Sequence, residues 1–551
     1  MGFGFQPEAS SGCLLFSLLW QPEGSSAGAG PFPLVRRSGG RREETRMLAP
    51  TPELRPLHAA EKSRLILVSN RGPVEHWFDD SQRIRRREAA GGVASALGAV
   101  AKRSPVTWLA AAASEADKAV AILGGKVRIA SDSELRLLEL PPAAYEHFYQ
   151  SFCNPILWFV QHSLGHLLDR RDLASEALAS WHAGYLPVNR RFAEAAIEEI
   201  PGDGSSAQVM LHDYHLYLAP RFIRASRPQA ALQHFVHIPW PAPSDWRHLP
   251  SFLVRRLCGA MLANDSIVFQ TEAFVENFMA TCDAYLGGRA VVRERYGSIQ
   301  FLGHTAHVTS NPVSVDVDEL KALRSTPQWQ EYRRALTAPP GVKTIVRVDR
   351  LDPSKNVERG FEAFELLLKR NPGLRGRVRF LAFLVPSRCG VPEYASYAKR
   401  VFDRVNAINA VYGNPEWTPV TLFYEHNRTQ ALAGLSLYDV LLVNSLADGM
   451  NLVSKEGPVV NANDGVLVLS EAAGSFEELR HGAIAIDPYD VGGTADALRA
   501  ALSMEPVERR IRQQALRDAI CAHQITDWLR QQLKDLSIAE HMKRFASEAS
   551  A

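Results

Sequence analysis

Residues 440–456 read VLLVNSLADGMNLVSKE, and this stretch decides the fold. Its first four residues are a short apolar run of the kind that forms buried parallel strands. A polar loop follows at 448–451, and Gly457-Pro458 keeps any helix that begins near Asn451 short or kinked. A loop between a strand and a helix presents free backbone N–H groups at the positive end of the helix dipole. The stretch therefore predicts a seat for an anionic or hydroxyl-rich ligand, although D-G-x-N alone is more often an ordinary turn.

An apolar run with a polar exit recurs along the chain. It appears at 64–70, 208–211, 234–236 and 266–271, and again at 343–348, 379–385, 420–424, 440–443, 465–469 and 483–486. Strands that alternate with helices indicate doubly wound parallel sheets. We therefore expect an α/β fold with two Rossmann-like domains, residues 61–312 and 313–510, and closing helices over 511–551.

The amino-acid composition limits the classes of function that the chain can have. Lys and Arg number 62 and Asp and Glu number 60, so the net charge of +2 gives no case for binding nucleic acid or an anionic membrane. No apolar run reaches the roughly 18 residues that cross a bilayer. The six cysteines are scattered without a C-x-x-C motif, which fits reduced thiols in the cytoplasm. The oligomeric state stays open, a homo-oligomer included.

The first 60 residues differ from the rest. They are rich in Gly, Pro, Ser and Arg and lack helical or strand periodicity. We expect a disordered leader here, with Met47 as an alternative start of translation. The apolar patch at 13–20 has no Lys or Arg before it, which argues against a secretory signal. The predicted location is therefore the cytoplasm.

Two cations follow the predicted strand at 343–348. Arg350 and Lys355 are five residues apart in a strand-to-helix loop, and such a pair can straddle a diphosphate. Polar groups at the carboxyl ends of parallel strands are where open α/β sheets bind ligands. The pair can therefore neutralise a leaving diphosphate without a metal.

Other polar groups at strand ends fit the remaining parts of two ligands. Asp448 and the backbone amides of 449–452 can hold a sugar. Arg71 and Arg388 are then left as cations for a second, phosphorylated ligand. Two domains with such groups on facing edges would suit an enzyme that joins two soluble ligands.

Two patterns have the form of metal sites, but a metal is not the better interpretation of either. His212 and His215 have the spacing of zinc ligands, but no third ligand accompanies them. Asp316-Val317-Asp318 has the form of a D-x-D metal motif, yet Asp316 fits better as the cap of a helix that begins at Val317. We therefore expect no protein-bound metal.

Three weaker signals fit ordinary structural roles. The basic run Arg83–Arg87 is predicted to be a solvated loop, with a phosphate-attracting lid as the minor alternative. Gly91-Gly92 suits a tight turn, or a close backbone approach to a ligand. The aromatic stretch 149–158 is predicted to be helix core, except that Tyr149 and Trp158 have polar groups that can face a sugar.

Six motifs together resemble a known family. They read VSNRGP (68–73), HDYHLYLAP (212–220), HIPWP (237–241), RLDPSKN (350–356), VPSR (385–388) and DGMNLVSKE (448–456). In type and spacing they resemble the trehalose-6-phosphate synthases, retaining glucosyltransferases of the two-domain GT-B fold. The resemblance implies two domains that face each other across a cleft. It also implies transfer of glucose from a nucleotide-glucose, with UDP-glucose expected, to glucose-6-phosphate, which gives trehalose-6-phosphate.

The resemblance further implies roles for single residues. It assigns to the acceptor Arg71, Tyr149, Trp158 and Arg388. It assigns to the donor Gly92, Arg350, Lys355, Asp448, Gly449, Met450, Asn451, Leu452 and Glu456, with Glu456 on the ribose. The implied catalytic set is Asp213, His237, Arg350, Lys355 and Asp448.

Such enzymes have no placed carboxylate nucleophile. The implied mechanism is front-face displacement, in which the departing phosphate helps to deprotonate the incoming hydroxyl. The protein must then orient two substrates and stabilise the charge that grows on the leaving diphosphate. We expect no cofactor, and a nucleotide-glucose and a sugar phosphate as the small-molecule partners.

Three departures from the family pattern leave the acceptor open. Ala447 stands where the family has Arg, Gly457-Pro458 stands where it has Tyr, and Ala111 stands where many members have the second Trp of W-x-G-W. That Trp lies near the acceptor in those enzymes. Glycerol-3-phosphate and a phosphorylated aminocyclitol are therefore alternative acceptors, although Met450 favours ordinary nucleotide-glucose chemistry. A catalytically silent regulatory homologue is a further alternative, and the donor base stays open among uracil, guanine and adenine.

Overall fold

The computed structural model describes residues 64–88, 97–98, 100–101, 104–124, 126–168, 171–202, 207–293 and 297–548. These residues belong to one compact unit that runs from Ser63 to Ala551. Two predictions lie outside the described residues: the leader at 1–60 with its alternative start at Met47, and the donor contact of Gly92.

The first half of the unit is built on a mixed sheet, in which ten strands fall within the described residues. Their order is β10 (Ala290–Arg293), β11 (Ser298–Phe301), β12 (His304–Ser310), β9 (Ser266–Phe269), β8 (Ala231–Phe235), β7 (Ala207–His212), β1 (Arg64–Val68), β4 (Val106–Ala111), β6 (Ser133–Leu138) and β5 (Lys126–Ala130). The strands from β12 to β6 pair in parallel, and β10, β11 and β5 add antiparallel pairs at the two edges. Leu65 to Val68 of β1 are buried because helices cover both faces of a sheet of this kind.

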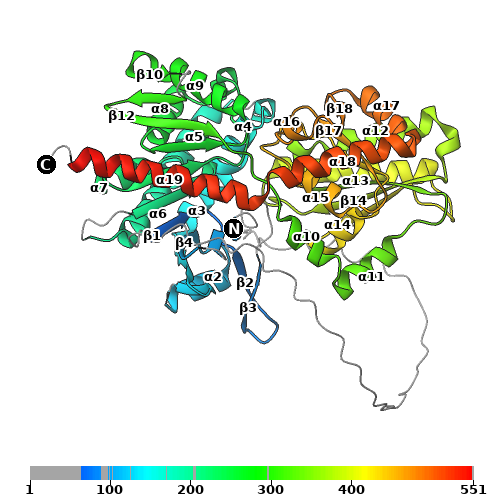
Figure 1. The fold of residues 1–551 in the computed structure, drawn as a ribbon, viewed down its shortest axis with the longest axis horizontal. Helices are drawn as coiled ribbons and strands as arrows, with labels where there is room; N and C mark the ends of the chain where they lie inside the picture. Colours follow the sequence, from blue (N-terminus) through cyan, green and yellow to red (C-terminus); the bar gives the residue numbers. More distant parts are fainter. Residues whose placement is uncertain are drawn as a thin grey trace, which may run out of the picture. The chain divides into compact units, whose positions relative to one another are not determined.

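The second half is built on a parallel sheet, of which six strands lie in the described part of the chain. Their order is β15 (Val420–Tyr424), β14 (Val378–Val385), β13 (Lys343–Arg350), β16 (Val440–Val443), β17 (Val466–Ser470) and β18 (Ile484–Ile486). Figure 1 shows the two sheets in separate halves of the ribbon, the first in blue to green and the second in yellow to orange.

Helices flank both sheets. In the first half they are α2 (Glu115–Ile122), α3 (Pro142–Glu146), a π-helical segment (His147–Leu157), α4 (Trp158–Gln161), α5 (Leu173–Ser180), α6 (Leu186–Glu199), α7 (Ala219–Ser226), α8 (Ser251–Met261) and α9 (Glu272–Leu286). In the second half they are α10 (Val317–Leu323), α11 (Pro327–Leu336), α12 (Val357–Arg370), α13 (Pro392–Tyr412), α14 (Arg428–Leu435), α15 (Val453–Val460), α16 (Phe476–Leu479), α17 (Val491–Ser503) and α18 (Pro506–Ala522). The last helix is α19 (Ile525–Glu548). No helix in the described ranges has both the length and the apolar character that a membrane crossing requires.

The chain passes between the two halves twice. The first passage follows β12, and the second lies between α18 and α19, which returns to the first sheet (Figure 1). The passages touch, because the N–H of Ile525 donates to the carbonyl of Val315 at 3.3 Å. The buried Lys455 donates to the carbonyl of Val313 at 2.9 Å and pairs with Glu478 at 2.5 Å. Lys455 therefore ties the first passage to the helix that follows β16.

The helix α19 is anchored on the first sheet by one aromatic side chain and several polar ones. Trp528 is fully buried and meets the ring of Phe235 edge-on at 5.3 Å. Burying a side chain of this size contributes on the order of 3 kcal/mol. The amide of Gln208 also donates to Glu540 at 2.6 Å.

The fold confirms the expected α/β class with two Rossmann-like halves. The helix after Asn451 is short and contains Pro458, as predicted. Asp316 caps α10 as predicted, with its carboxylate accepting from the N–H of Glu319 at 3.0 Å. Phe152 and Leu157 are buried in the helical segment where core residues were expected.

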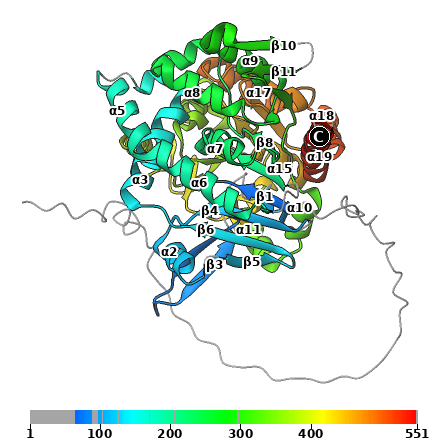
Figure 2. The same cartoon turned by 90° about the vertical axis from the view of Figure 1, so that its left-hand side faces the viewer.

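One prediction of local structure is wrong. Arg83–Arg87 is not a loop, because most of it belongs to β3 (Ile84–Glu88), which pairs with β2 (Val74–Phe78) in a hairpin beside α2 (Figure 2). The basic side chains are exposed, as predicted. Arg87 lies opposite Glu75 and pairs with it at 3.1 Å, and such cross-strand pairs of opposite charge stabilise a hairpin. The strands β4, β5 and β6 were also not predicted.

Candidate active site

Side chains from the ends of the two sheets meet at one place. The indole N–H of Trp158, from the first half, donates to Asp352 of the second half at 3.3 Å. Arg388, after β14, reaches the hydroxyl of Tyr214 at 3.3 Å. Tyr214, Asp352 and Arg388 follow the carboxyl ends of parallel strands, which is where open α/β folds bind ligands, and Trp158 reaches them from the start of α4.

Asp448 lies after β16 and is the centre of the second half's contribution. Its carboxylate pairs with Lys355 and accepts from the amide of Asn451 at 3.0 Å. Burial acts to raise the pKa of Asp448, but Lys355 and Asn451 outweigh it, and the pKa is lowered from its ordinary value. The carboxylate is therefore charged and able to accept hydrogen bonds from hydroxyl groups.

The loop from Gly449 to Leu452 lies against the first half. A Cβ on Gly449 would come within 1.9 Å of the carbonyl oxygen of His237, so only glycine fits there. Asn451 has a φ of 75°, in the left-handed region that few non-glycine residues adopt. The N–H groups of Gly449 to Leu452 donate to no other described residue, which leaves them available to a ligand.

Two side chains in this loop face the interior. Met450 is buried in the core beside Trp528, and Leu452 is partly buried against the same cluster. A donor contact from either residue would therefore come from its backbone. Glu456, one turn into α15, lies 3.7 Å from Arg428, and burial raises the pKa of its carboxyl.

Three arginines surround two aromatic side chains. The guanidinium carbons of Arg388 and Arg350 lie 3.8 Å and 5.0 Å from the ring centroid of Trp158. Arg71 lies 3.4 Å from the hydroxyl of Tyr149. The side chains of Arg71 and Arg350 are 54% and 42% exposed, whereas that of Arg388 is 6% exposed, so the first two can meet a ligand without rearrangement.

The pKa of Tyr149 reflects the positive charge of the three arginines. Burial acts to raise the pKa of its hydroxyl, but Arg71, Arg388 and Arg350 outweigh burial, and the pKa falls below its ordinary value. The ring of Tyr149 stacks between Tyr145 at 5.7 Å and His215 at 6.0 Å. The predicted acceptor residues Arg71, Tyr149, Trp158 and Arg388 are therefore brought together, with Arg350 beside them.

Asp213 and His237 form the first half's edge of the site. Asp213 follows β7 with a φ of 70°, and its carboxylate accepts from the N–H of His237 at 3.3 Å. Burial raises the pKa of Asp213 to about 7 and lowers the pKa of His237 to about 3. His237 is therefore neutral and can donate or accept a hydrogen bond. Its ring lies 3.2 Å from His212.

The buried histidines make a pH dependence of stability expected. Burial lowers the pKa of His162 and His234 to about 4, and that of His237 to about 3. Below pH 6.5 the unfolded chain binds these protons and the folded chain does not, so stability decreases as the pH decreases, by up to about 1.4 kcal/mol per pH unit for each histidine. Asp213 acts in the opposite sense, because the folded chain keeps its proton up to about pH 7.

We expect a lower melting temperature at pH 5 than at pH 7, measured by scanning calorimetry. The interior histidines, whose pKa burial lowers (His162, His212, His215, His234 and His237), outnumber the interior carboxyls whose pKa burial raises (Asp213, Asp349 and Glu456). His234→Gln should reduce the difference, and Asp213→Asn should enlarge it. A melting temperature that stays constant between these pH values would contradict the assignment of neutral, buried histidines.

Several residues at the site were not predicted from the sequence. Asp352 contacts Trp158, Arg388 and Tyr394, and it follows Arg350 by two positions in the RLDPSKN motif. Its position near Arg350 in this motif was the only feature of the sequence that indicated a role for Asp352. The ring of His162 stacks on that of Trp158 at a centroid distance of 4.0 Å, and no sequence pattern predicts this contact. Among the described residues, no three His, Cys, Asp or Glu side chains lie where they could hold a metal.

A cavity of about 340 Å³ adjoins Arg71. Its wall includes Trp77 and Arg87 from the β2–β3 hairpin, Ala111 at the end of β4 and Ala113 just beyond it. Ala111, the position of the missing second Trp, therefore borders open space beside a predicted acceptor residue.

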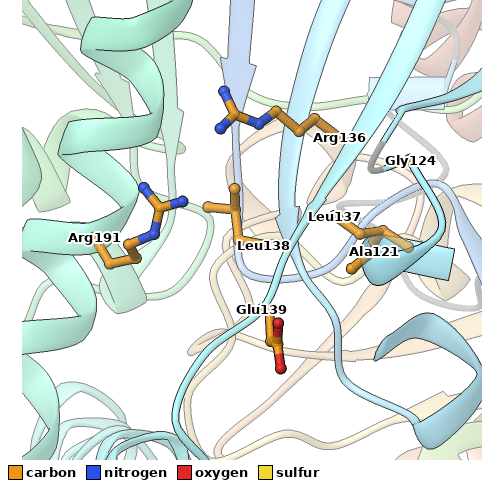
Figure 3. Close-up of a pocket in the computed structure, with 7 residues that line it drawn as sticks. All are labelled: Ala121, Gly124, Arg136, Leu137, Leu138, Glu139 and Arg191. Carbon is orange, nitrogen blue, oxygen red and sulfur yellow. The ribbon is translucent and has the colours of Figure 1, made fainter. Parts of the chain in front are cut away.

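A second cavity, of about 430 Å³, lies between β6 and α6. Figure 3 shows Arg136 from β6 and Arg191 from α6 at its wall, with Glu139 directed away from them. Both arginines pair with Glu198, and Arg136 also pairs with Glu199 at 2.9 Å. These cations are neutralised, and none of the predicted site residues lines this cavity, whereas Arg71 lines the first.

Known proteins resemble this chain in sequence and structure. The family model for glycosyltransferase family 20 matches residues 63–538. The bifunctional trehalose-6-phosphate synthase/phosphatase of Thermoproteus tenax is 33% identical over 479 residues, which are 84% of this chain and 62% of that protein. This chain thus spans less than two thirds of that relative. The trehalose-6-phosphate synthase of Sinorhizobium fredii is 32% identical, over 86% of this chain and 98% of that protein.

Solved structures also match. One from E. coli, bound with UDP-2-fluoro glucose, superposes with a TM-score of 0.73 at 28% identity and covers 86% of this chain and 99% of that chain. A UDP-forming α,α-trehalose-phosphate synthase from Burkholderia xenovorans, in complex with glucose-6-phosphate, gives a TM-score of 0.73 at 27% identity and covers 86% of this chain and 100% of that chain.

Proposed function

The chain belongs to glycosyltransferase family 20, and on this premise we propose that it transfers glucose from UDP-glucose to glucose-6-phosphate to give trehalose-6-phosphate. The observation that carries the proposal is the meeting of Arg71, Arg350 and Arg388 around Tyr149 and Trp158. Arg350 and Arg388 share the carboxylate of Asp352 and Arg71 pairs with Glu75, so the cations exceed the carboxylates they pair with, which suits phosphorylated ligands. The product and the cytoplasm as its place of synthesis are part of the same proposal.

The donor is proposed to lie on the second half. Arg350 and Lys355 would take the diphosphate, Asp448 and the amides of 449–452 the glucose, and Glu456 the ribose. The free N–H groups of this loop support the assignment. The E. coli relative, solved with UDP-2-fluoro glucose, supports uracil as the base.

The acceptor is proposed to lie on the first half, between Arg71 and Trp158. Arg71 would take its phosphate, because its guanidinium is exposed and, among the described residues, contacts Glu75 at 3.3 Å and Tyr149. Arg388, which packs against the ring of Trp158, would add positive charge near the acceptor. The Burkholderia relative, solved with glucose-6-phosphate, supports this acceptor.

The reaction is proposed to proceed by front-face displacement with retention. The bond between the anomeric carbon and the diphosphate breaks, the acceptor hydroxyl bonds to the same face, and its proton passes to the departing phosphate. Arg350 and Lys355 stabilise the charge that grows on that phosphate. His237, which is neutral, and Asp448 orient the glucose, so the protein itself need not transfer the proton.

The test is product analysis. UDP-, GDP- and ADP-glucose are each combined with glucose-6-phosphate and with glycerol-3-phosphate, and the products are identified by mass spectrometry and NMR. The proposal expects trehalose-6-phosphate as the main product, from UDP-glucose. Another glucoside as the main product would show that the acceptor is not glucose-6-phosphate. If no pair gives a glucoside, the chain is a regulatory protein and not a glucosyltransferase.

Ala111 favours a second candidate, in which the same donor serves a different phosphorylated acceptor. Its small side chain leaves the 340 Å³ cavity open beside Arg71. The chain supplies no contact to a sugar ring at this position. An acceptor without a sugar ring would therefore bind without losing a contact there. Glycerol-3-phosphate and a phosphorylated aminocyclitol are the acceptors in question.

Ala111→Trp tests the role of this position. We expect the ratio of kcat/KM for glucose-6-phosphate to that for glycerol-3-phosphate to rise at least about ten-fold, because the indole adds a surface that only the longer acceptor reaches, and apolar pocket contacts of this size are worth about 10- to 200-fold. Ala121→Trp, in the other cavity, is the matched control and should leave the ratio unchanged. Equal ratios in both variants would remove Ala111 from the acceptor site.

A further inference from the structure

We propose that Asp352 is a positioning residue that couples the two anion-binding sides of the active site, by holding Arg388 and Trp158 on the acceptor side in a fixed relation to Arg350 on the donor side. The inference rests on the proposed function and goes beyond it, because it concerns how one bound ligand affects the other.

Asp352 is fully buried and makes different contacts through its two carboxylate oxygens. Oδ1 accepts from the N–H of Ser354 at 3.1 Å, from its hydroxyl at 3.0 Å, and from the indole of Trp158 at 3.3 Å. Oδ2 accepts from Arg388 at 2.6 Å and from the hydroxyl of Tyr394 at 3.1 Å. Arg350 lies 3.8 Å from Oδ2.

A purely local role would need only one of these oxygens. Capping the turn that begins at Ser354 uses Oδ1 alone. Oδ2 is directed to Arg388 and Tyr394, which lie 36 and 42 positions further along the chain. The second oxygen therefore connects the donor loop to the loop that carries the predicted phosphate-binding arginine.

The same carboxylate lies between two guanidinium groups that contact one aromatic ring. Arg388 and Arg350 both lie over Trp158, at 3.8 Å and 5.0 Å from its centroid, and the indole N–H is held by Asp352 itself. A shift of either arginine must therefore be accommodated by Trp158, by Asp352 or by the other arginine. Packed groups of this kind carry coupling between neighbouring ligands.

Charge also favours coupling. When an anion draws one arginine away from Asp352, the carboxylate interacts with the other arginine alone. The position of that second arginine is then more restricted. The second anion meets an ordered partner and binds more tightly. Coupling between sites typically amounts to about 5- to 150-fold in affinity and is reciprocal.

The test is isothermal titration calorimetry with UDP as the probe, in the absence and presence of saturating glucose-6-phosphate. For the unaltered chain we expect at least a five-fold gain in UDP affinity when glucose-6-phosphate is present. For Asp352→Asn we expect the gain to fall below two-fold. Ser354→Ala, which removes the hydroxyl held by Oδ1, should keep the full gain, and so should Asp316→Ala, which loses a helix cap elsewhere.

Tyr394→Phe covers the case in which Asp352→Asn does not fold. It removes the hydrogen bond to Oδ2 and the one that Arg388 donates to the same hydroxyl at 2.6 Å, while Asp352 and Arg388 stay paired. It should reduce the gain at least two-fold. Full gain in Asp352→Asn, full gain in Tyr394→Phe, or no gain in the unaltered chain would each overturn the inference. Failure of the proposed function is a separate result: the product analysis would then yield no trehalose-6-phosphate, whatever the binding of UDP and glucose-6-phosphate shows.

Discussion

Arg350→Ala is expected to lower kcat by a factor of about 10² to 10³, which corresponds to roughly 3–4 kcal/mol of lost transition-state stabilisation, by analogy with the removal of an oxyanion donor. The guanidinium is half exposed beside Trp158 and points from the end of β13 into the site. Because negative charge grows on the diphosphate as it leaves, the loss should appear mainly in kcat and less in the KM for UDP-glucose.

Steady-state kinetics with varied UDP-glucose measure this effect. Arg375→Ala is the matched control, since Arg375 lies over Tyr412 at 5.1 Å and contacts none of the site residues in the described part of the chain. Arg350→Lys should recover part of the rate, because it restores the charge without the two-pronged geometry of the guanidinium. Near-normal turnover of Arg350→Ala would show that the diphosphate lies elsewhere.

Gly449→Ala is expected to lower kcat/KM by a factor of about 100 or more. The added Cβ would lie 1.9 Å from the carbonyl oxygen of His237 and 3.0 Å from the Cα of Ile238, both of which are backbone atoms in the other half. The loop after β16 must therefore move by an ångström or more. A misplacement of that size at an active site costs about 10²-fold in rate.

The measurement pairs kcat/KM with the melting temperature. Gly373→Ala, where a Cβ meets nothing within 4 Å, is the control and should change neither quantity. We expect Gly449→Ala to lose far more activity than stability, since a small outward movement of one loop relieves the contact. Unchanged kcat/KM in Gly449→Ala would mean that the loop's distance from His237 has no role in the reaction.

Much of the fold could be predicted because its signals are local. Each strand of the second sheet is a short, mostly apolar run, and the groups after it, such as Arg350 and Asp448, are placed by the end of the strand. The cap at Asp316 and the short helix after Asn451 were likewise predictable from neighbouring residues. The hairpin of β2 and β3 was missed because its charged second strand has no apolar face.

The site itself could be predicted only in part, because its organisation depends on distant contacts. Trp158 and Asp352 are 194 positions apart, and nothing in either local sequence indicates that they touch. The need for glycine at Gly449 comes from a backbone 212 positions earlier, at His237. The cavity beside Ala111 depends on a hairpin from another part of the chain.

The joint between the halves has a consequence for how such a protein can diverge. Lys455, which grips the linking segment at Val313, immediately precedes Glu456, which is proposed to hold the nucleoside. A mutation that loosens or stiffens this joint would displace the neighbouring carboxylate as well. The rigidity of the joint and the binding of the ribose are thus linked, so selection on one of them also alters the other.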